Sequence, residues 1–217
     1  MFPTFIVGGR FMAEIRVGRA LDPGMDRGLL DAMFRLRFEV FHRRLGWRVT
    51  TRAGREVDGY DRLDPVYMAA RRDDGDVVGC WRMLPTTGRY MLRDTFPELL
   101  DGEEAPRDPR IWELSRFAVA QAAPGDHRAA LVGNTTLEMI REVIEYADDH
   151  GIDAYVTVTS VALERLLRRS GIPLHRFGEG RSRRVGHVNS VACWVPVNDE
   201  MRAAVGARMP LGRREAA

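Results

Sequence analysis

Short runs of apolar residues, some of them alternating with polar ones, indicate where this chain forms strands. Such runs predict six strands, at residues 14–17, 66–70, 77–84, 111–119, 154–159 and 188–197. The turn Arg72-Asp73-Asp74-Gly75 separates the second run from the third, which is typical of a β-hairpin. The front half of the chain is therefore expected to be rich in hairpins.

Apolar residues at helical spacing predict three helices that cover this sheet. The first follows Pro23 and spans roughly 20 residues, with apolar side chains recurring as far as Phe41. The second carries one apolar stripe and ends at Gly151, and the third occupies residues 161–170 before Gly171. A hairpin-rich front half joined to a βαβ-like back half predicts an α/β fold, a single-domain mixed β-sheet flanked by helices, which is the layered plan of acyltransferase-like folds.

The length and the ends of the chain predict one domain with two tails. A chain of 217 residues, 45% of them hydrophobic, can bury one sizeable core, which we assign to residues 13–205. Residues 1–12 are expected to be a disordered extension or the result of a mis-chosen start. Residues 206–217 are rich in Gly, Arg and Ala and are expected to be a frayed tail.

Targeting signals and cysteine usage predict a cytoplasmic protein. The amino terminus lacks a basic leader with a long apolar core, and nowhere does an apolar run reach about 18 residues, so we expect neither export nor membrane insertion. The two cysteines, Cys80 and Cys193, lie far apart in apolar runs and are expected to be reduced core residues.

The basic residues are unusual because all 33 of them are arginines. The absence of lysine excludes Schiff-base chemistry, a pyridoxal anchor and the lysine of a phosphate-binding P-loop. The 31 carboxylates leave a net charge of only +2, which argues against nucleic acid as a partner. The histidines show no metal-ligand spacing, so we expect no metal site at His42, His127, His150, His175 or His187.

Several charged residues interrupt apolar elements, where an ionised group must be paired or neutralised. Glu113 and Arg116 lie three apart in one apolar strand, so they point to opposite faces unless a bulge re-aims one of them. Arg82 lies in another apolar strand, and Arg37 lies on an apolar helical stripe. Each of these residues, taken alone, fits a structural ion pair or an arginine whose guanidinium reaches water. Together they predict a charged cavity for a zwitterionic or anionic ligand.

The connection 46–64 is long and has no clear period, which makes it a candidate functional loop. Its Asp58 and Asp61 stand beside Gly and Pro, where aspartates usually form turns or cap helices, and they are also candidate carboxylates for the charged cavity. Three aromatic residues, Phe41, Trp47 and Phe96, either form walls of this cavity or are ordinary core residues.

The order and spacing of these motifs resemble the acyl-homoserine-lactone synthase (autoinducer synthase) family over residues 12–197. The matching motifs are Arg37-Phe38-Glu39-Val40-Phe41, Leu45-Gly46-Trp47, Asp58-Gly59-Tyr60-Asp61, Arg82 and Glu113-Leu114-Ser115-Arg116-Phe117. The resemblance implies a fold related to N-acetyltransferases and the transfer of an acyl group from a thioester, usually on acyl-carrier protein, to S-adenosylmethionine. The implied products are an N-acyl-homoserine lactone, which is a quorum-sensing signal, methylthioadenosine and the free carrier. S-adenosylmethionine is then a substrate, and no cofactor is expected.

The resemblance also implies roles for the charged and aromatic residues. Those expected to surround S-adenosylmethionine are Arg37, Phe41, Trp47 and Asp58, to which we add Phe96 as a candidate aromatic wall, and those expected to be catalytic are Glu113, Asp61, Arg116 and Arg82. Attack on the thioester requires the amine to lose a proton, for which Glu113 is the first candidate and Asp61 the second. Asp58 is expected to bind the cationic groups of the ligand.

The arginines are expected to serve these acids or the ligand. Arg37 either contacts the carboxylate of the ligand or holds Asp58 and Asp61, while Arg82 and Arg116 orient the acids, with Arg116 as the partner of Glu113. A bulge in the strand of Glu113 would free backbone N–H groups to stabilise an oxyanion.

The acyl donor and the alternatives to this function remain open in the sequence. The pyrophosphate loop of coenzyme A-dependent acetyltransferases is not evident at residues 121–128, which favours acyl-carrier protein, although acyl-CoA stays an alternative. A basic dock for an acidic carrier, or simply a solvated surface, is expected at Arg165, Arg168, Arg169, Arg176, Arg181, Arg183 and Arg184. The rival functions are an N-acyltransferase with another amine acceptor and a non-enzymatic arginine-rich binding module.

Overall fold

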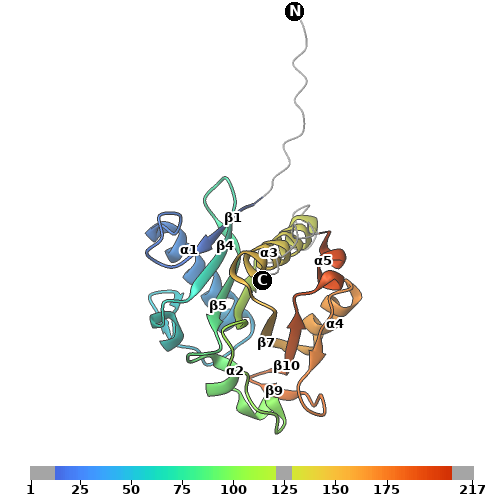
Figure 1. Ribbon diagram of the computed structural model, residues 1–217. Coiled ribbons are helices and arrows are strands. Elements are labelled where there is room, and N and C mark those ends of the chain that lie inside the picture. Colours follow the sequence, from blue (N-terminus) through green and yellow to red (C-terminus); the bar gives the residue numbers. More distant parts are fainter. Residues whose placement is uncertain (1–12, 121–128, 207–217) are drawn as a thin grey trace, which may run out of the picture.

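The computed structural model describes residues 13–120 and 129–206 and shows one twisted sheet between layers of helix (Figure 1). The strands follow the order β1-β4-β5-β6-β7-β10-β8, with β9 paired to β10. Their bounds are β1 Glu14–Gly18, β4 Val66–Arg71, β5 Val77–Pro85, β6 Ile111–Val119, β7 Ala154–Ser160, β8 His175–Arg176, β9 Arg183–Val185 and β10 Val188–Pro196. The mixed sheet of the expected fold class is therefore present, and the strands predicted from the apolar runs are confirmed.

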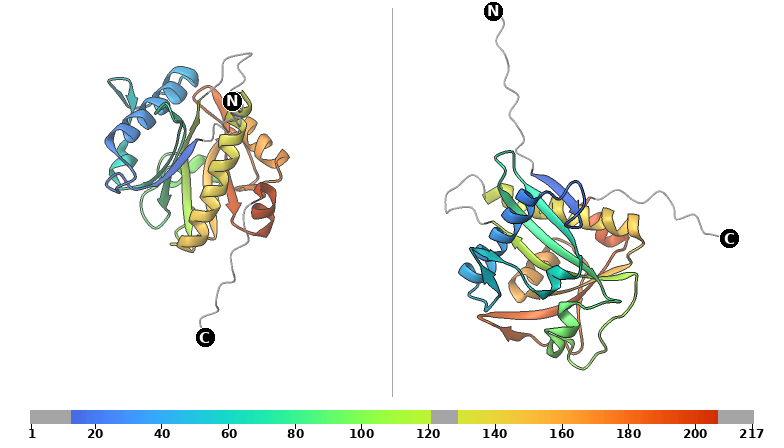
Figure 2. Two further views of the ribbon diagram at one scale, coloured as in Figure 1. Left: turned by 90° about the horizontal axis from the view of Figure 1, so that it is seen from above. Right: turned by 90° about the vertical axis from the view of Figure 1, so that its left-hand side faces the viewer.

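The helices cover both faces of the sheet. They are α1 Arg27–Arg37, α2 Met91–Asp94, α3 Ala129–His150, α4 Val161–Arg169 and α5 Asp199–Val205, with a π-helix η1 at Phe38–Arg44 and 3-10 helices η2 at Gly59–Arg62 and η3 at Pro97–Leu100. Helices α3 and α5 pack on one face through a large apolar cluster, and α1 packs on the other face (Figure 2). The three helices expected from the sequence are α1 with η1, α3 and α4.

The first helix continues into a wider turn that aims its last residues. Asp26 caps α1 by accepting from the N–H of Leu29 at 2.9 Å, and the buried stripe includes Leu29 and Met33. The helix then passes without a break into η1, where the N–H of Leu45 donates to Val40 at 3.0 Å, five residues back. Wider turns of this kind often lie at functional sites because they shift the register of the side chains.

The strand β6 contains the irregularity that its two charged residues required. Between Cys80 and Arg82 the neighbouring strand β5 advances by two residues, while β6 advances by three, from Ser115 to Ala118. Arg116 lies in this bulge with a φ of 57°, in the left-handed region. The expected departure from regular pleating is confirmed, and it turns Arg116 toward the α1 face.

The parallel pair β6–β7 is short. Its pairing runs from Ile111↔Ala154 to Leu114↔Thr157, whereas β6 continues to Val119 and β7 to Ser160. All other strand pairs in the sheet are antiparallel. The bulge therefore lies at the point where the two halves of the sheet stop pairing.

The loop 46–64 contains the short hairpin of β2 Thr51–Arg52 with β3 Arg55–Glu56, followed by η2. The tail 1–12 and residues 121–128 lie outside the described residues, and of the tail 206–217 the structure describes only Gly206, the left-handed cap of α5. Within residues 13–120 and 129–206, each helix is too short or too polar to cross a membrane.

Candidate functional site

Three guanidiniums and four carboxylates gather on the α1 face of the sheet. They come from α1 (Arg37), β3 (Glu56), the loop and helix η2 (Asp58, Asp61), β5 (Arg82) and β6 (Glu113, Arg116). Four of the seven residues are 1% exposed or less: Arg37, Glu56, Arg82 and Glu113. If all seven are ionised, the carboxylates exceed the guanidiniums by one negative charge, so the cluster matches a cationic partner.

Arg37 holds two of the acids. Its Nε donates to Oε2 of Glu56 at 2.6 Å, and its two Nη atoms donate to the two oxygens of Asp61 at 2.8 and 2.9 Å. Its guanidinium also lies 5.2 Å from the centre of the Phe34 ring. Of the two roles expected for Arg37, the structure favours the one that holds the acids, with Glu56 in the place foreseen for Asp58.

Asp61 is saturated with donors. Its Oδ1 accepts from Arg37, from Arg82 at 3.0 Å and from the hydroxyl of Tyr67 at 2.9 Å, while its Oδ2 accepts from Arg37 and from the N–H of Asp58 at 2.7 Å. Burial raises the pKa of Asp61, but the attraction of Arg37 and Arg82 outweighs it and holds that pKa well below its usual range. A carboxylate this strongly ionised is a weak proton acceptor.

Asp58 is both a cap and a member of the charged cluster. Its Oδ1 accepts from the N–H groups of Tyr60 at 2.8 Å and Asp61 at 3.3 Å, which caps η2, and from Nη1 of Arg82 at 2.6 Å. Its Oδ2 is buried and lies 2.7 Å from Nη2 of Arg116, but no donor is aligned with it for a hydrogen bond. This oxygen is therefore available for a donor from a ligand.

Arg116 contacts different partners from those expected. Its Nε and Nη2 donate to Oε1 of Glu56 at 3.1 and 3.0 Å, and its guanidinium lies 5.3 Å from the centre of the Phe41 ring. The expected pairing of Arg116 with Glu113 is wrong, because the bulge directs the guanidinium toward β3. Arg116 and Arg37 thus hold Glu56 from two sides.

Glu113 anchors a backbone segment. Its two carboxylate oxygens accept from the N–H groups of Met91 at 2.9 Å and Leu92 at 2.6 Å, at the beginning of α2. Burial raises the pKa of Glu113, and the two N–H donors together with Arg82 and Arg116 limit the rise. The side chain of Met91 lies on the same cluster, since its sulfur accepts from Arg82 at 3.0 Å and from Arg116 at 3.2 Å.

Glu113→Gln is expected to lower the free energy of unfolding by about 1–3 kcal/mol, because one amide oxygen cannot accept both N–H groups and the amide nitrogen then faces a donor. The pKa of Glu113 is raised above its usual 4.5, so its contribution to stability is complete below that pH and is lost as the pH rises through the folded value. The variant lacks this component. Urea denaturation at several pH values should therefore show a difference in the free energy of unfolding between the wild type and the variant. This difference should be largest near pH 4.5 and decrease as the pH rises. A deficit that widens with pH would contradict the assignment.

The aromatic residues divide between two places. Phe41 and Trp47 stack with ring centres 5.2 Å apart, next to Arg116, and the indole nitrogen of Trp47 is buried without a partner. Phe96 does not join them; it packs against the cluster of Leu84, Tyr90 and Leu92 on another part of the sheet. The expected aromatic wall is therefore built by Phe41 and Trp47, and the placing of Phe96 in it is not supported by the geometry.

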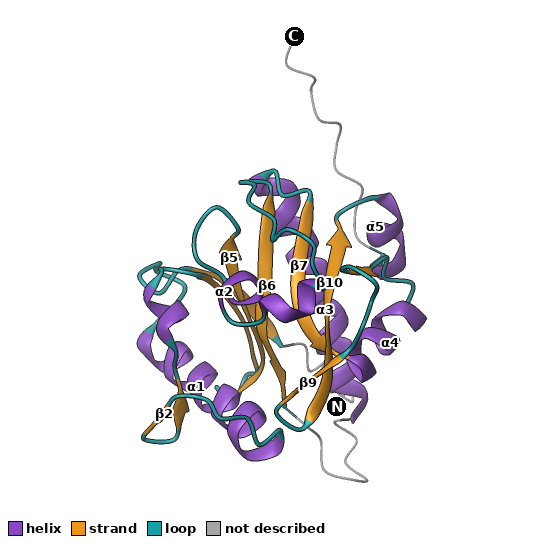
Figure 3. Ribbon diagram, turned by 90° about the horizontal axis from the view of Figure 1, so that it is seen from below, coloured by secondary structure: helices purple, strands orange, loops and turns teal. Residues whose placement is uncertain are grey.

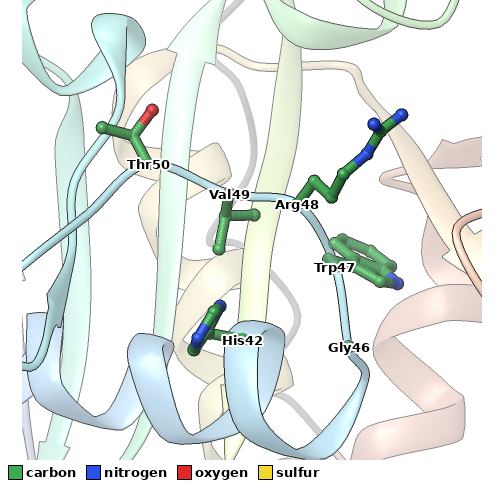
Figure 4. A pocket seen from close by; sticks show the side chains of 6 residues that line it. All are labelled: His42, Gly46, Trp47, Arg48, Val49 and Thr50. Carbon is green, nitrogen blue, oxygen red and sulfur yellow. The ribbon is translucent and has the colours of Figure 1, made fainter.

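An open pocket of about 520 Å³ adjoins Trp47, lined by His42, Gly46, Trp47, Arg48, Val49 and Thr50. In Figure 4, Val49 points toward His42 of η1, while Arg48 points the other way. Trp47 lines this pocket and also stacks on Phe41, whose ring lies 5.3 Å from the guanidinium of Arg116 in the charged cluster.

Sequence reasoning missed three residues of the cluster. Glu56 is fully buried and is the acid that joins Arg37 to Arg116, Tyr67 donates to Asp61, and Met91 accepts from two arginines. One signal for Glu56 was present: it stands two residues before Asp58 around the exposed Val57, so the two acids share a side of an extended segment. Tyr67 and Met91 resemble ordinary core residues in sequence.

Comparisons with known proteins show the family of this chain. Residues 24–205 match the family model described as autoinducer synthase. The acyl-homoserine-lactone synthase of Vibrio anguillarum is 46% identical over 178 residues, which cover 81% of this chain and 90% of the relative. The crystal structure of the AHL synthase LasI has a TM-score of 0.82 at 39% identity and covers 94% of this chain and 100% of that one.

Two further structures bear on the donor and on the fold. BjaI, described as a CoA-dependent acyl-homoserine lactone synthase and solved with SAM and isopentyl-CoA, has a TM-score of 0.76 at 27% identity, with 91% of each chain covered. A putative N-acetyltransferase from Lactobacillus plantarum is 12% identical with a TM-score of 0.51 over 85% of this chain and 99% of that one. The latter shares the fold alone, which confirms the N-acetyltransferase-like layers.

Proposed function

Because this chain belongs to the acyl-homoserine-lactone synthase (autoinducer synthase) family and is therefore an acyltransferase, we propose that it joins an acyl group from acyl-carrier protein to S-adenosylmethionine. The amine of S-adenosylmethionine attacks the thioester, and the carboxylate then closes the lactone by displacing methylthioadenosine. The observation that carries this proposal is the buried cluster of four carboxylates and three guanidiniums, in which Oδ2 of Asp58 lies beside Arg116 but accepts no hydrogen bond.

The proposed amine site is Oδ2 of Asp58. S-adenosylmethionine carries a sulfonium and, near neutral pH, an ammonium with a pKa of about 8, and both favour carboxylates and aromatic faces. Asp58 offers Oδ2, which accepts no hydrogen bond although Arg116 lies 2.7 Å away, and the Phe41–Trp47 stack offers the rings. We infer that the ammonium donates to Oδ2, next to Arg116.

The same oxygen is our preferred proton acceptor. Asp61 is saturated by five donors, and both oxygens of Glu113 accept from backbone N–H groups, so neither has a free oxygen for the amine. The bound ammonium first gives one proton to Asp58, directly or through water, which frees the lone pair that attacks the thioester. The nitrogen of the tetrahedral adduct is acidic, and its proton leaves with the thiolate that the adduct expels. Glu113 and Asp61 then act by holding α2 and the arginines in place.

The bulge in β6 is the proposed place for the thioester. A bulged residue leaves its backbone groups outside the ladder, so an N–H near Arg116 can donate to the oxyanion of the tetrahedral intermediate. Collapse of that intermediate expels the thiolate of the carrier. In this scheme S-adenosylmethionine is consumed as a substrate, and no resident cofactor or metal takes part.

Acyl-carrier protein is our preferred donor because part of the expected basic dock is free. Arg168 and Arg176 are bound by the buried Glu164, and Arg181 and Arg183 face Asp101. Arg165 and Arg169 of α4 are exposed, and within the described chain neither pairs with a carboxylate. Leu166 between them is 55% exposed, which suits a surface that meets an acidic helical protein.

An assay with S-adenosylmethionine and matched donors tests the function and the donor together. Acyl-carrier protein thioester should release methylthioadenosine and an acyl-homoserine lactone, with kcat/KM at least about tenfold above that for the acyl-CoA. Arg165→Glu with Arg169→Glu should remove this preference and leave the acyl-CoA rate unchanged, which serves as the internal control. Another acylated amine as product would favour the rival N-acyltransferase, and equal rates with both donors would overturn the carrier proposal.

A further inference from the structure

Two turns from opposite halves of the sheet meet beside Trp47. One is the Gly46-Trp47 turn after η1, and the other is the Gly186-His187 turn between β9 and β10. In Figure 3 the β9–β10 turn extends toward the end of the helix that begins with α1. The contact crosses the region where β6 and β7 have stopped pairing.

The contact is reciprocal and depends on two glycines. A Cβ on Gly186 would lie 3.0 Å from Cδ1 of Trp47, and a Cβ on Gly46 would lie 3.1 Å from Cδ2 of His187. Both glycines have a positive φ, 60° and 62°, which other residues adopt at a cost. In each turn, therefore, the glycine leaves the space in which the ring of the other turn packs.

This contact is connected to the charged cluster through aromatic rings. Gly186 touches Trp47, Trp47 stacks on Phe41, and the ring of Phe41 lies 5.3 Å from the guanidinium carbon of Arg116. Arg116 in turn approaches Oδ2 of Asp58, the oxygen to which we assign the substrate amine. A shift of the β9–β10 turn would therefore move the wall of the amine site.

We propose that Gly186 and His187 are positioning residues for S-adenosylmethionine, acting through the orientation of Trp47. This inference rests on the proposed function, since it assigns a second support to the same amine site. The β9–β10 turn comes from the half of the sheet that contains β7 and β10, so the amine site is completed by a segment about 140 residues away from Trp47 along the chain, and contacts so distant in sequence become neighbours only on folding. The turn thus contributes to substrate affinity without touching the substrate.

Gly186→Ala is the main test, with Gly54→Ala as its matched control. Gly54 has a φ of 72° and nothing within 4 Å of its Cβ position, so Ala costs similar backbone strain there without touching a ring. Proteins labelled with 5-fluorotryptophan are compared by fluorine NMR, with Trp47→Phe identifying the signal of Trp47. Gly186→Ala should shift that signal and weaken S-adenosylmethionine binding about fivefold or more, while KM for the acyl donor stays within about twofold. Gly54→Ala should do neither.

Two more variants distinguish the positioning role from a general loss of folding. His187→Ala removes the other ring of the contact without adding strain and should also shift the Trp47 signal and weaken binding. In a Trp47→Ala background, Gly186→Ala should cost no more affinity than Gly54→Ala, because the ring that it displaces is gone.

The outcomes separate this inference from the function on which it rests. An unmoved Trp47 signal, or a moved signal with unchanged affinity, overturns the positioning role while the wild-type enzyme still makes lactone. Equal losses in Gly186→Ala and Gly54→Ala overturn it as well. If the wild-type protein fails to bind S-adenosylmethionine at all, the proposed function fails first and the inference falls with it.

Discussion

Replacing Glu56 with Gln is expected to lower the free energy of unfolding by about 3–5 kcal/mol, enough to unfold a marginal domain. Glu56 is 0% exposed and lies between the guanidiniums of Arg37 and Arg116, which donate to it at 2.6 and 3.0 Å. Gln keeps the shape but loses the charge, and its amide nitrogen must face one of the two guanidiniums. A buried cation then lacks its partner, which costs far more than the loss of a surface pair.

The matched control is Glu39→Gln. Glu39 belongs to an exposed pair with Arg43 one helical turn away, at 3.0 Å, and its side chain is 53% exposed. Its loss should cost at most about 0.5 kcal/mol. Urea denaturation of both variants measures the difference, and a Glu56→Gln protein as stable as Glu39→Gln would show that Glu56 does not hold the cluster together.

Asp58→Asn is expected to reduce kcat/KM for S-adenosylmethionine about 100-fold or more while leaving a folded protein. The amide oxygen of Asn can still accept the bonds that Oδ1 receives from Tyr60, Asp61 and Arg82. The amide nitrogen replaces Oδ2 and lies next to Nη2 of Arg116, which keeps its hydrogen bonds to Glu56, so the cluster loses one negative charge but no buried guanidinium is left without a partner. The ammonium of the substrate meets a donor instead of a carboxylate, and no group remains to take its proton. Steady-state kinetics with calorimetric titration of S-adenosylmethionine separates the loss of binding from the loss of chemistry.

Asp64→Asn controls for the change of charge in the same loop. Asp64 pairs with Arg19 at the surface, and its side chain is 63% exposed. It should keep its activity within about twofold. A kcat/KM for Asp58→Asn that stays within a few-fold of the wild type would reject both the amine site and the proposed base.

The sequence alone predicted the frame of this molecule because its signals are local. Alternation located β4 and β5 with their turn, helical spacing located the helix that ends in Arg37, and glycines marked the ends of α3 and α4. The two charges of β6 even predicted the bulge, since a shared cavity requires a departure from the period of two. What these signals have in common is a short distance along the chain.

The partners within the site were harder to predict because they come together only in the folded molecule. Arg116 is separated from Glu56 by 60 positions, and no spacing rule connects them, whereas its neighbour in sequence, Glu113, binds the backbone of α2 instead. Phe96 was assigned to the aromatic wall by residue type, which carries no information about the cluster in which a ring packs. The short strands β8 and β9 are too brief to show a period.

The left-handed backbone at Arg116 has a consequence for anyone who engineers this enzyme. A non-glycine residue held at a φ of 57° carries a strain of roughly 1–3 kcal/mol. In a library screened for heat resistance alone, glycine at this position gains the relief of strain but loses the ion pairs of Arg116 with Glu56 and Asp58, and any clone in which the relief prevails is stable but inactive. Selection for heat resistance at position 116 should therefore be combined with a screen for the acyl-homoserine lactone product.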